Sequence, residues 1–358
     1  MTRPTRLGVI GVRLGRWHVE SFLQVPDSEV TAVCDLDAQR LEAVKAEFEV
    51  PRGYTTVEDL LADDELDAVS VCLPNFLHAQ VAIAALKAGK HVLIEKPLAR
   101  TVAEGEAIVE AARHTGLQVM VAMKFRFLPQ VAYLKRQIEA GNLGHIYYGW
   151  NRYLRPVGKG IPGRWFCRRE LSGGGTLIDN GVHLLDVTWH LMGHPEPVEV
   201  LGACYAEFGP RGKGTPPEDV AAFDVEDFAA GMIRFADGSS MVLDNAWAAH
   251  VADTQIGATV FGSEGGGSVW PFQVVEERDG KSSDVTPPVE QLPTETQFAH
   301  FVRSIREGTP NTSPAEQGLV VLRMLAALDR SARSARSVLL SPDDSLVGVD
   351  SARAAAIG

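Results

Sequence analysis

The sequence predicts an α/β protein with two domains, residues 1–123 and 124–358. Through residue 123, short β-branched runs alternate with stretches of helical periodicity. From Pro197 to Val275 one strand pattern follows another with little helix between them. The chain has 358 residues, 45% of them hydrophobic and 22% charged, which is ordinary for a globular protein large enough to hold two cores.

The elements of the first domain alternate regularly along the chain. The expected strands are 6–11, 29–35, 67–74, 90–97 and 117–123, and the expected helices are 16–25, 37–48, 76–89 and 101–114. The last helix begins with a capping box, Thr101 and Glu104. The strands are nearly continuous apolar runs, as expected where helices cover both faces of a parallel sheet. We therefore predict a doubly wound parallel sheet of the Rossmann type.

The second domain is predicted to be α+β, with an open, mostly antiparallel sheet of five or six strands. A helix near 130–141 leads into an alternating strand at 145–154, a loop rich in Arg, Gly, Pro and Trp, and a helical stretch at 176–193. Further strands are expected at 198–208, 227–238, 239–250, 254–262 and 266–275. Helices near 296–308 and after a second capping box, Ser313 to Glu316, complete the chain and are candidates to pack on the first domain.

Composition excludes several classes of function. A net charge of −12 argues against nucleic acid as a partner, because phosphate binding needs a basic surface. No apolar run reaches the roughly 18–20 residues of a membrane span, and the first residues lack a signal peptide, so a cytoplasmic protein is expected. The four cysteines lie far apart without a C-x-x-C pair, so neither a metal site nor a disulfide is expected.

The stretch "GVIGVRLGRWH" resembles a dinucleotide-binding turn that is one residue short. Such turns read G-x-G-x-x-G; here Gly11 and Gly15 are present, and the middle glycine is missing. Val12, Arg13 and Leu14 lie between them, and Val12 or Arg13 must supply the backbone contact to a pyrophosphate. Arg13 or Arg16 could add positive charge beside the phosphates.

Asp35 ends the second expected strand, 20 residues after Gly15. A carboxylate there accepts hydrogen bonds from ribose hydroxyls and repels a 2′-phosphate, which favours NAD over NADP. Two glycines and an aspartate are also common at strand ends in proteins without a cofactor.

Two further motifs carry chemistry. Lys96, in Glu95-Lys96-Pro97, follows a predicted strand where doubly wound sheets bind ligands, although a lysine before a proline is more often a solvated loop residue. Asp179 and His183 follow "GGG" and are spaced i, i+4 on one helix face. Imidazole is a natural general base that a carboxylate can orient. The same pair could be an ordinary helix-surface pair or hold a metal, but no third ligand is evident.

Together these motifs resemble the Gfo/Idh/MocA family of sugar- and cyclitol-oxidising enzymes. The resemblance runs through "VCLPNFLHAQVAIAALKAGKHVLIEKPLART", "GGGTLIDNGVHLLD", "VEDFAAGMIRFADG" and "AHFVRSIREGTPNTSPAEQGL". It implies an N-terminal Rossmann domain and a C-terminal domain on an open antiparallel sheet. That sheet often forms the subunit interface in the family, which implies a homodimer or homotetramer.

The resemblance also assigns roles by position. It implies that Lys96 contacts substrate and nicotinamide, that Asp179 binds substrate and that His183 is the catalytic base. It places Leu73, Pro74, Asn75, His78 and Glu95 around the cofactor cleft. Arg126 stands where the family has an arginine near the substrate, but the preceding Met123-Lys124-Phe125 departs from the usual pattern. Arg155, Arg164 and Trp165 of the loop are candidates for specificity, or else form a solvated basic loop with one anchoring aromatic side chain.

The function expected from these residues is NAD(P)-dependent oxidation, or the reverse reduction, at a secondary hydroxyl of a sugar, sugar derivative or cyclitol. Two alternatives stay open: a redox-neutral enzyme that keeps NAD tightly bound, and a non-catalytic sugar or NAD sensor on the same fold. The retention of Lys96, Asp179 and His183 favours the dehydrogenase. The sequence does not name the substrate.

Overall fold

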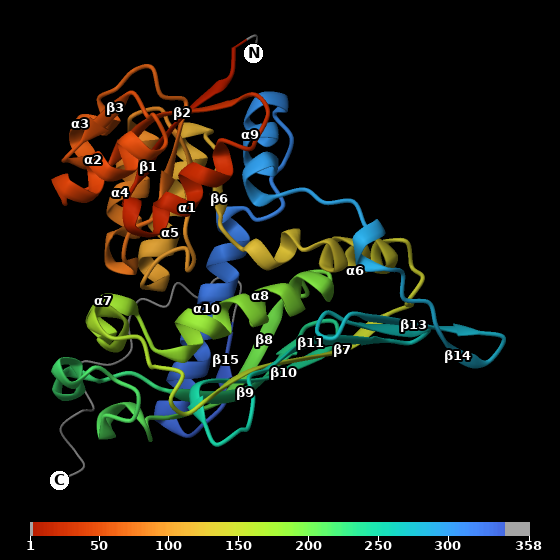
Figure 1. Ribbon diagram of the computed structural model, residues 1–358. Helices are drawn as coiled ribbons and strands as arrows, with labels where there is room; N and C mark the ends of the chain where they lie inside the picture. The colour runs from red at the N-terminus through yellow and green to blue at the C-terminus, as the bar shows by residue number, and fades with distance from the viewer. Residues whose placement is uncertain (1–2, 341–358) are drawn as a thin grey trace.

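The computed structural model describes residues 3–340 and contains two sheets, each covered by helices (Figure 1). The first sheet has six parallel strands in the order β3-β2-β1-β4-β5-β6. Its strands are β1 (Thr5–Ile10), β2 (Ser28–Cys34), β3 (Arg52–Tyr54), β4 (Ala68–Val71), β5 (His91–Ile94) and β6 (Val119–Val121). Its helices are α1 (Val12–Phe22), α2 (Ala38–Glu47), α3 (Val57–Leu61), α4 (Asn75–Lys87) and α5 (Val102–Thr115).

This sheet confirms the predicted doubly wound fold. The strands are buried nearly throughout, which explains why their sequences are apolar runs without alternation. The strand order reverses between β1 and β4, and ligands of such sheets bind beyond the carboxyl ends of the strands at this point. Strand β3 and helix α3 were not predicted, because they are too short to show a period.

Two local predictions at helix starts have different outcomes. The capping box of α5 is confirmed: Thr101 Oγ1 accepts the N–H of Glu104, whose carboxylate accepts the N–H of Thr101. The second capping box is wrong. Helix α10 (Ala315–Ser334) has Pro314 at its N-cap, and Ser313 Oγ has no hydrogen-bond partner among the described residues. The Ser313 carbonyl instead accepts the N–H of Val121, which holds this segment against β6.

The second sheet has nine strands in the order β14-β13-β12-β11-β7-β10-β9-β8-β15. They are β7 (Ile146–Pro156), β8 (Pro197–Tyr205), β9 (Phe228–Phe235), β10 (Ser240–Ala249), β11 (Gln255–Gly262), β12 (Gly265–Ser268), β13 (Gln273–Arg278), β14 (Lys281–Asp284) and β15 (Val338–Leu339). All neighbouring pairs are antiparallel except β7 and β10, so the predicted mostly antiparallel character is confirmed. The sheet has more strands than expected, because several edge strands are too short to be recognised in the sequence.

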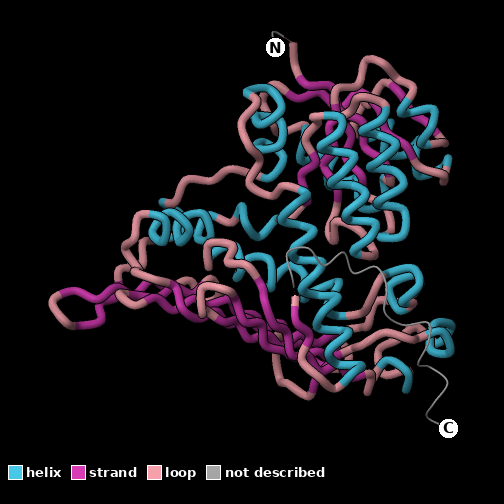
Figure 2. The backbone as a smooth tube through the Cα atoms, turned by 180° about the vertical axis from the view of Figure 1, so that it is seen from behind, coloured by secondary structure: helices cyan, strands magenta, loops and turns pink. Residues whose placement is uncertain are grey.

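One face of the second sheet is covered and the other is open (Figures 1 and 2). Helices α6 (Pro129–Glu139), α8 (Val182–Leu191) and α10 lie over the covered face. A Cβ added at Gly202 or Gly231 would meet Leu328 of α10, so their neighbours Leu201 and Met232 face the open side. Helix α7 (Arg169–Ser172) lies beside the first domain.

The last helices connect the two domains. Helix α9 (Gln297–Glu307) packs on α1, where the ring of Phe298 contacts Trp17, His18 and Phe22. Helix α10 packs on both α5 and β8. Within residues 3–340, no helix has the length and apolar character needed to cross a membrane.

Candidate active site

Both glycines of the short turn are required by close approach to neighbouring strands. Gly11 has φ +87°, and a Cβ there would lie 2.5 Å from the carbonyl oxygen of Cys72. A Cβ at Gly15 would lie 2.7 Å from Val9 Cγ1. Helix α1 begins directly after Gly11, four residues earlier than predicted, because the turn is shortened.

The first turn of α1 offers two backbone donors to a ligand. Its first i→i−4 hydrogen bond runs from the Gly15 N–H to the Gly11 carbonyl, so the N–H groups of Arg13 and Leu14 precede the helical ladder. The Val12 N–H is already used, because it donates to Asp35 Oδ2 at 3.0 Å. Of the residues proposed for pyrophosphate contact, Arg13 and Leu14 are therefore the ones with available N–H groups.

Positive charge at this turn comes from Arg13 rather than Arg16. The Arg16 guanidinium is paired with the carboxylate of Glu47 and lies over the ring of Phe48. Arg13 is exposed, and its side chain forms no ion pair within the described part of the chain.

Asp35 lies at the end of β2, beside this turn, as the sequence predicts. Its Oδ1 accepts the N–H of Asp37 at 2.9 Å, and Arg40 Nη1 lies 3.0 Å from the same oxygen. Oδ2 accepts the Val12 N–H and lies 3.3 Å from the same Arg40 nitrogen, so a ribose hydroxyl would share or replace the Arg40 contact. Sequence reasoning missed Arg40 and also Leu36, whose side chain is 88% exposed next to Asp35. Two available helix N–H groups, this carboxylate and an exposed apolar side chain fit a bound dinucleotide.

The residues expected around the cofactor cleft tie it to the second domain. Pro74 precedes α4, and Asn75 Nδ2 donates to the carbonyl oxygen of Ser172 on α7 at 2.8 Å. The imidazole of His78 lies between the carbonyl oxygens of Leu73 and Pro97, at 2.8 Å from each. Burial lowers the pKa of His78. These side chains thus hold the loop after β4 against the loop after β5.

A buried ion pair lies directly behind Lys96. His18 Nε2 is 2.9 Å from Glu95 Oε1, and His18 Nδ1 is 2.7 Å from Ser70 Oγ. Glu95 Oε2 accepts the backbone N–H of Lys96 at 3.1 Å. Burial opposes the charged imidazolium, but Cys72 and Glu95 outweigh it and raise the pKa of His18 to about 10. Sequence reasoning assigned His18 no role; the signal was a histidine three residues after Gly15.

Lys96 and Asp179 meet across the two domains. Lys96 Nζ lies 3.0 Å from Asp179 Oδ1 and 2.9 Å from the Asp179 carbonyl oxygen. Asp179 Oδ2 accepts the Nε1–H of Trp247 on β10 at 2.9 Å. Burial alone would raise the pKa of Asp179, but Lys96 and the Trp247 donor outweigh it and lower the pKa. The carboxylate is therefore ionised, and each of its oxygens accepts from one of these two side chains.

The glycine-rich segment before Asp179 allows this approach. Gly175 is so close to the backbone of Glu226 that a Cβ would overlap its carbonyl oxygen. The Glu226 carboxylate accepts the N–H groups of Gly175 and Leu177. Asp179 itself lies on a π-helical turn, Leu177–Gly181, which continues into α8.

His183, in the first turn of α8, has an imidazole whose charged form is disfavoured. Its buried Nδ1 has no hydrogen-bond partner among the described residues, and its ring lies 4.9 Å from that of Phe125. Burial lowers its pKa well below 6.5, and the cations Lys96 and Lys124 lower it further. Within residues 3–340 no hydrogen bond joins Asp179 to His183, so the expected orientation of the imidazole by this carboxylate is not observed.

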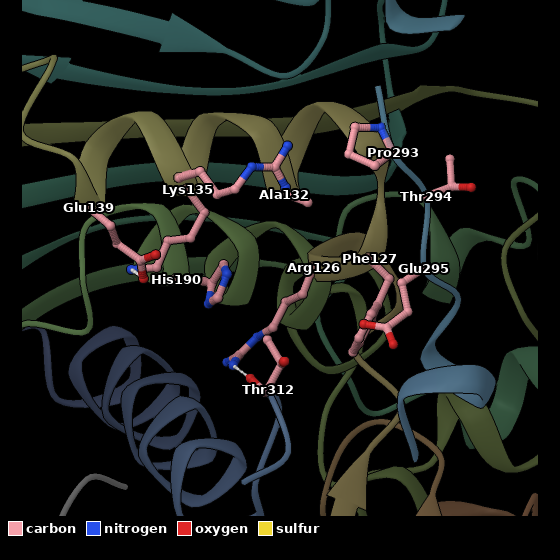
Figure 3. A pocket seen from close by; sticks show the side chains of 11 residues that line it. Arg126, Phe127, Ala132, Lys135, Glu139, His190, Pro293, Thr294, Glu295 and Thr312 are labelled. Atoms are coloured by element: carbon pink, nitrogen blue, oxygen red, sulfur yellow. Dashed lines mark hydrogen bonds and ion pairs between the residues drawn. The ribbon is translucent and has the colours of Figure 1, made fainter. Parts of the chain in front are cut away.

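Arg126 is bound by partners other than these groups and lines a pocket (Figure 3). Its guanidinium is 2% exposed, lies 2.9 Å from Asp186 Oδ2, and donates to the Thr312 carbonyl at 2.7 Å. It borders a pocket of about 400 Å³ that also contains His190, at the opposite end of α8 from His183. Lys135 of the same pocket is paired with Glu139. No hydrogen bond or ion pair connects Arg126 to Lys96, Asp179 or His183 within the described residues.

Arg155, which was expected in a loop but lies near the end of β7, contributes one charge near the site. Arg155 donates to the Lys159 carbonyl at 2.9 Å. Burial raises the pKa of Asp179, whereas Lys96, the Trp247 donor and, to a smaller extent, the charge of Arg155 lower it. The Arg164 side chain is exposed, while its backbone N–H donates to Asp219 Oδ2. The ring of Trp165 stacks on Phe166 at 3.8 Å. Of the three predicted loop residues, Arg155 is thus the one that the electrostatics link to Asp179.

Comparison with known proteins identifies the family. Residues 5–123 match the family model described as oxidoreductase family, NAD-binding Rossmann fold, and residues 131–267 match the GFO/IDH/MocA C-terminal domain. The chain belongs to the Gfo/Idh/MocA family. It is therefore an NAD(P)-dependent oxidoreductase, and the resemblance inferred from its motifs is confirmed.

Members of the Gfo/Idh/MocA family align with nearly the whole chain. D-glucoside 3-dehydrogenase of Escherichia coli (strain K12) is 29% identical over 350 residues, 94% of this chain and 98% of that protein. Myo-inositol 2-dehydrogenase of Thermotoga maritima is 28% identical over 347 residues, with the same coverage. An oxidoreductase domain protein from Kribbella flavida superposes with a TM-score of 0.85 at 26% identity, covering 95% of this chain and 100% of that one. A levoglucosan dehydrogenase in complex with NADH and L-sorbose has the same fold, with a TM-score of 0.85 at 24% identity and the same coverage.

Proposed function

We propose that the protein oxidises a secondary hydroxyl of a sugar, sugar derivative or cyclitol to a ketone, or catalyses the reverse reaction. The observation that carries the proposal is the meeting of Lys96 with Asp179 beside a neutral His183, at the ligand-binding edge of the first sheet. When bound, the nicotinamide accepts the hydride from the substrate carbon. NAD is the favoured form.

Lys96, His183 and Asp179 each have a distinct role in the rest of the reaction. An ammonium has three N–H donors, and Lys96 uses two of them on Asp179, so the third is available to the substrate oxygen. Because Nδ1 of His183 is buried, Nε2 is the nitrogen left to receive the hydroxyl proton. Asp179 holds Lys96 in place and keeps a spare lone pair on each oxygen for a second substrate hydroxyl.

The test of this function is a screen of sugars, glycosides and cyclitols with NAD and NADP, following nicotinamide absorbance. A dehydrogenase releases free NADH in proportion to product. A redox-neutral enzyme with tightly bound NAD turns over substrate without releasing NADH. Binding without turnover of any compound would support the sensor instead. The names of two relatives, a glucoside and an inositol dehydrogenase, make these compounds the first to try.

We expect NAD to bind more tightly than NADP by roughly tenfold or more. A 2′-phosphate would lie beside the carboxylates of Asp35 and Asp37, and like charges a few ångströms apart cost about 1–4 kcal/mol. Arg40 is paired with both carboxylates and so offers a 2′-phosphate little free charge. Calorimetric titration with each cofactor checks the preference, and equal affinities would contradict it.

We also propose a homodimer or homotetramer formed through the open face of the second sheet. Leu201 and Met232 are paired across β8 and β9 on this face and are 54% and 39% exposed. Light scattering is expected to give a mass of two or four chains, and Leu201→Glu with Met232→Glu is expected to reduce it toward one. Leu23→Glu, an equally exposed apolar site on the first domain, is the control and should leave the mass unchanged. A monomeric wild type would contradict the proposal.

A further inference from the structure

We propose that Trp247 is a positioning residue for the reaction: its indole N–H fixes the carboxylate of Asp179 and thereby sets the position of Lys96. This inference rests on the proposed function for its kinetic consequences, but its structural basis is independent of the substrate. No family motif in the sequence identified Trp247, which lies 68 residues from Asp179 along the chain.

The geometry gives each oxygen of Asp179 one side-chain donor. Oδ1 receives Lys96 Nζ at 3.0 Å, and Oδ2 receives Trp247 Nε1 at 2.9 Å. The terminal torsion of an aspartate is broad, so one donor alone does not hold the plane of its carboxylate. Two donors on opposite oxygens do hold it. With the plane fixed, the third N–H of Lys96 has a defined direction toward the substrate.

Trp247 can hold this position because its ring is immobilised on all sides. The side chain is 1% exposed and packs in a cluster with Ile161, Cys167, Phe223 and Val225. Its backbone N–H donates to the Asp227 carbonyl at 2.9 Å. Ile161 and Cys167 belong to the loop after β7. Trp247 therefore packs against this loop and also fixes, through Asp179, the position of Lys96.

The charged groups around Asp179 determine how its pKa responds to the loss of Trp247. Lys96, which follows β5, and Arg155 in β7 are the cations that lower the pKa of Asp179, and His183 from α8 titrates nearby. Trp247 is neutral and acts only as a hydrogen-bond donor to the charged carboxylate. Its loss therefore raises the pKa of Asp179 while all cations remain.

The experiment compares Trp247→Phe with Trp189→Phe, which likewise removes a buried indole donor, in this case from the Pro195 carbonyl. Trp247→Phe is expected to lower kcat by roughly ten- to a hundredfold with KM for NAD changed less than about twofold, since a misplaced group acts mainly on the chemical step. The acid limb of the kcat/KM profile is expected to move to higher pH. Trp189→Phe should lower the thermal midpoint but leave kcat and the profile unchanged.

Two further measurements make the outcome decisive. Crystal structures of the wild type and Trp247→Phe, both without substrate, should show the Lys96–Asp179 contact kept in the first and lost or rotated in the second. This holds even if no sugar is turned over, so it separates failure of the proposed function from failure of this inference. If Trp247→Phe does not fold, 3-benzothienylalanine at position 247 replaces the N–H by sulfur with the ring retained. Wild-type kcat and an unshifted profile in a folded variant, or identical effects of both substitutions, would overturn the proposal.

Discussion

Replacement of His183 by alanine is expected to lower kcat by roughly two to four orders of magnitude, the usual contribution of a general base. The imidazole is the titratable group beside Lys96 that is held neutral, because burial and the cations Lys96 and Lys124 disfavour its charged form. Cofactor affinity should stay within a fewfold of the wild type, since His183 lies on α8 in the second domain. Initial rates and calorimetric titration with NAD measure the two quantities separately.

The matched control is His190→Asn. His190 lies on the same helix, is also buried, and also has its pKa lowered well below 6.5 by burial and nearby cations. It faces the pocket near Arg126 rather than Lys96 (Figure 3). Its replacement should leave kcat within a fewfold of the wild type. Full activity of His183→Ala would remove this residue from the mechanism.

The pH dependence follows from the direction of the same shift. A base works in its unprotonated form, and the pKa of His183 lies well below 6.5. As pH falls from 8, kcat/KM is therefore expected to stay level through pH 6.5 and to decline only at lower pH. Asp179, whose pKa is also lowered, remains ionised over the level range. An acid limb near pH 7 that disappears in His183→Ala would contradict this prediction, because kcat/KM reports ionisations of the enzyme before substrate binds.

The sequence was sufficient for the features that depend on local patterns. Apolar runs alternating with helices predicted the parallel sheet, and the spacing from Gly15 to Asp35 placed the carboxylate at the correct strand end. The position of Lys96 after an apolar strand placed it at the ligand-binding edge. Each of these follows from one strand and the residue next to it.

The sequence was insufficient where distant segments meet. The i, i+4 spacing predicted contact between Asp179 and His183, but the π-helical turn changes the angle between them and directs Asp179 to Lys96. Trp247 reads as an ordinary core residue of an apolar strand, because its polar partner is far away in sequence. The occupation of the Val12 N–H by Asp35 likewise depends on how close β1 and β2 lie.

Arg126 illustrates the same limit, and its replacement is expected to affect stability rather than catalysis. Arg126→Met leaves the Asp186 carboxylate buried without its partner, which costs about 3–5 kcal/mol of unfolding free energy. It also leaves the Thr312 carbonyl without its guanidinium donor, so the contact between α8 and the start of α10 weakens. The midpoint of urea unfolding should fall sharply, while the substrate KM of the folded fraction stays within about twofold of the wild type.

The double variant Arg126→Met, Asp186→Leu separates an ion pair from a substrate contact. Replacing both partners removes the uncompensated charge, so most of the lost stability should return, because a buried pair and an apolar pair of similar volume are close in free energy. A substrate-binding arginine would behave differently: KM would rise in both variants, and the unfolding midpoint would change little. The guanidinium is bound by Asp186 and the Thr312 carbonyl, and no hydrogen bond or ion pair joins it to Lys96, Asp179 or His183 within residues 3–340, so this geometry favours the first outcome.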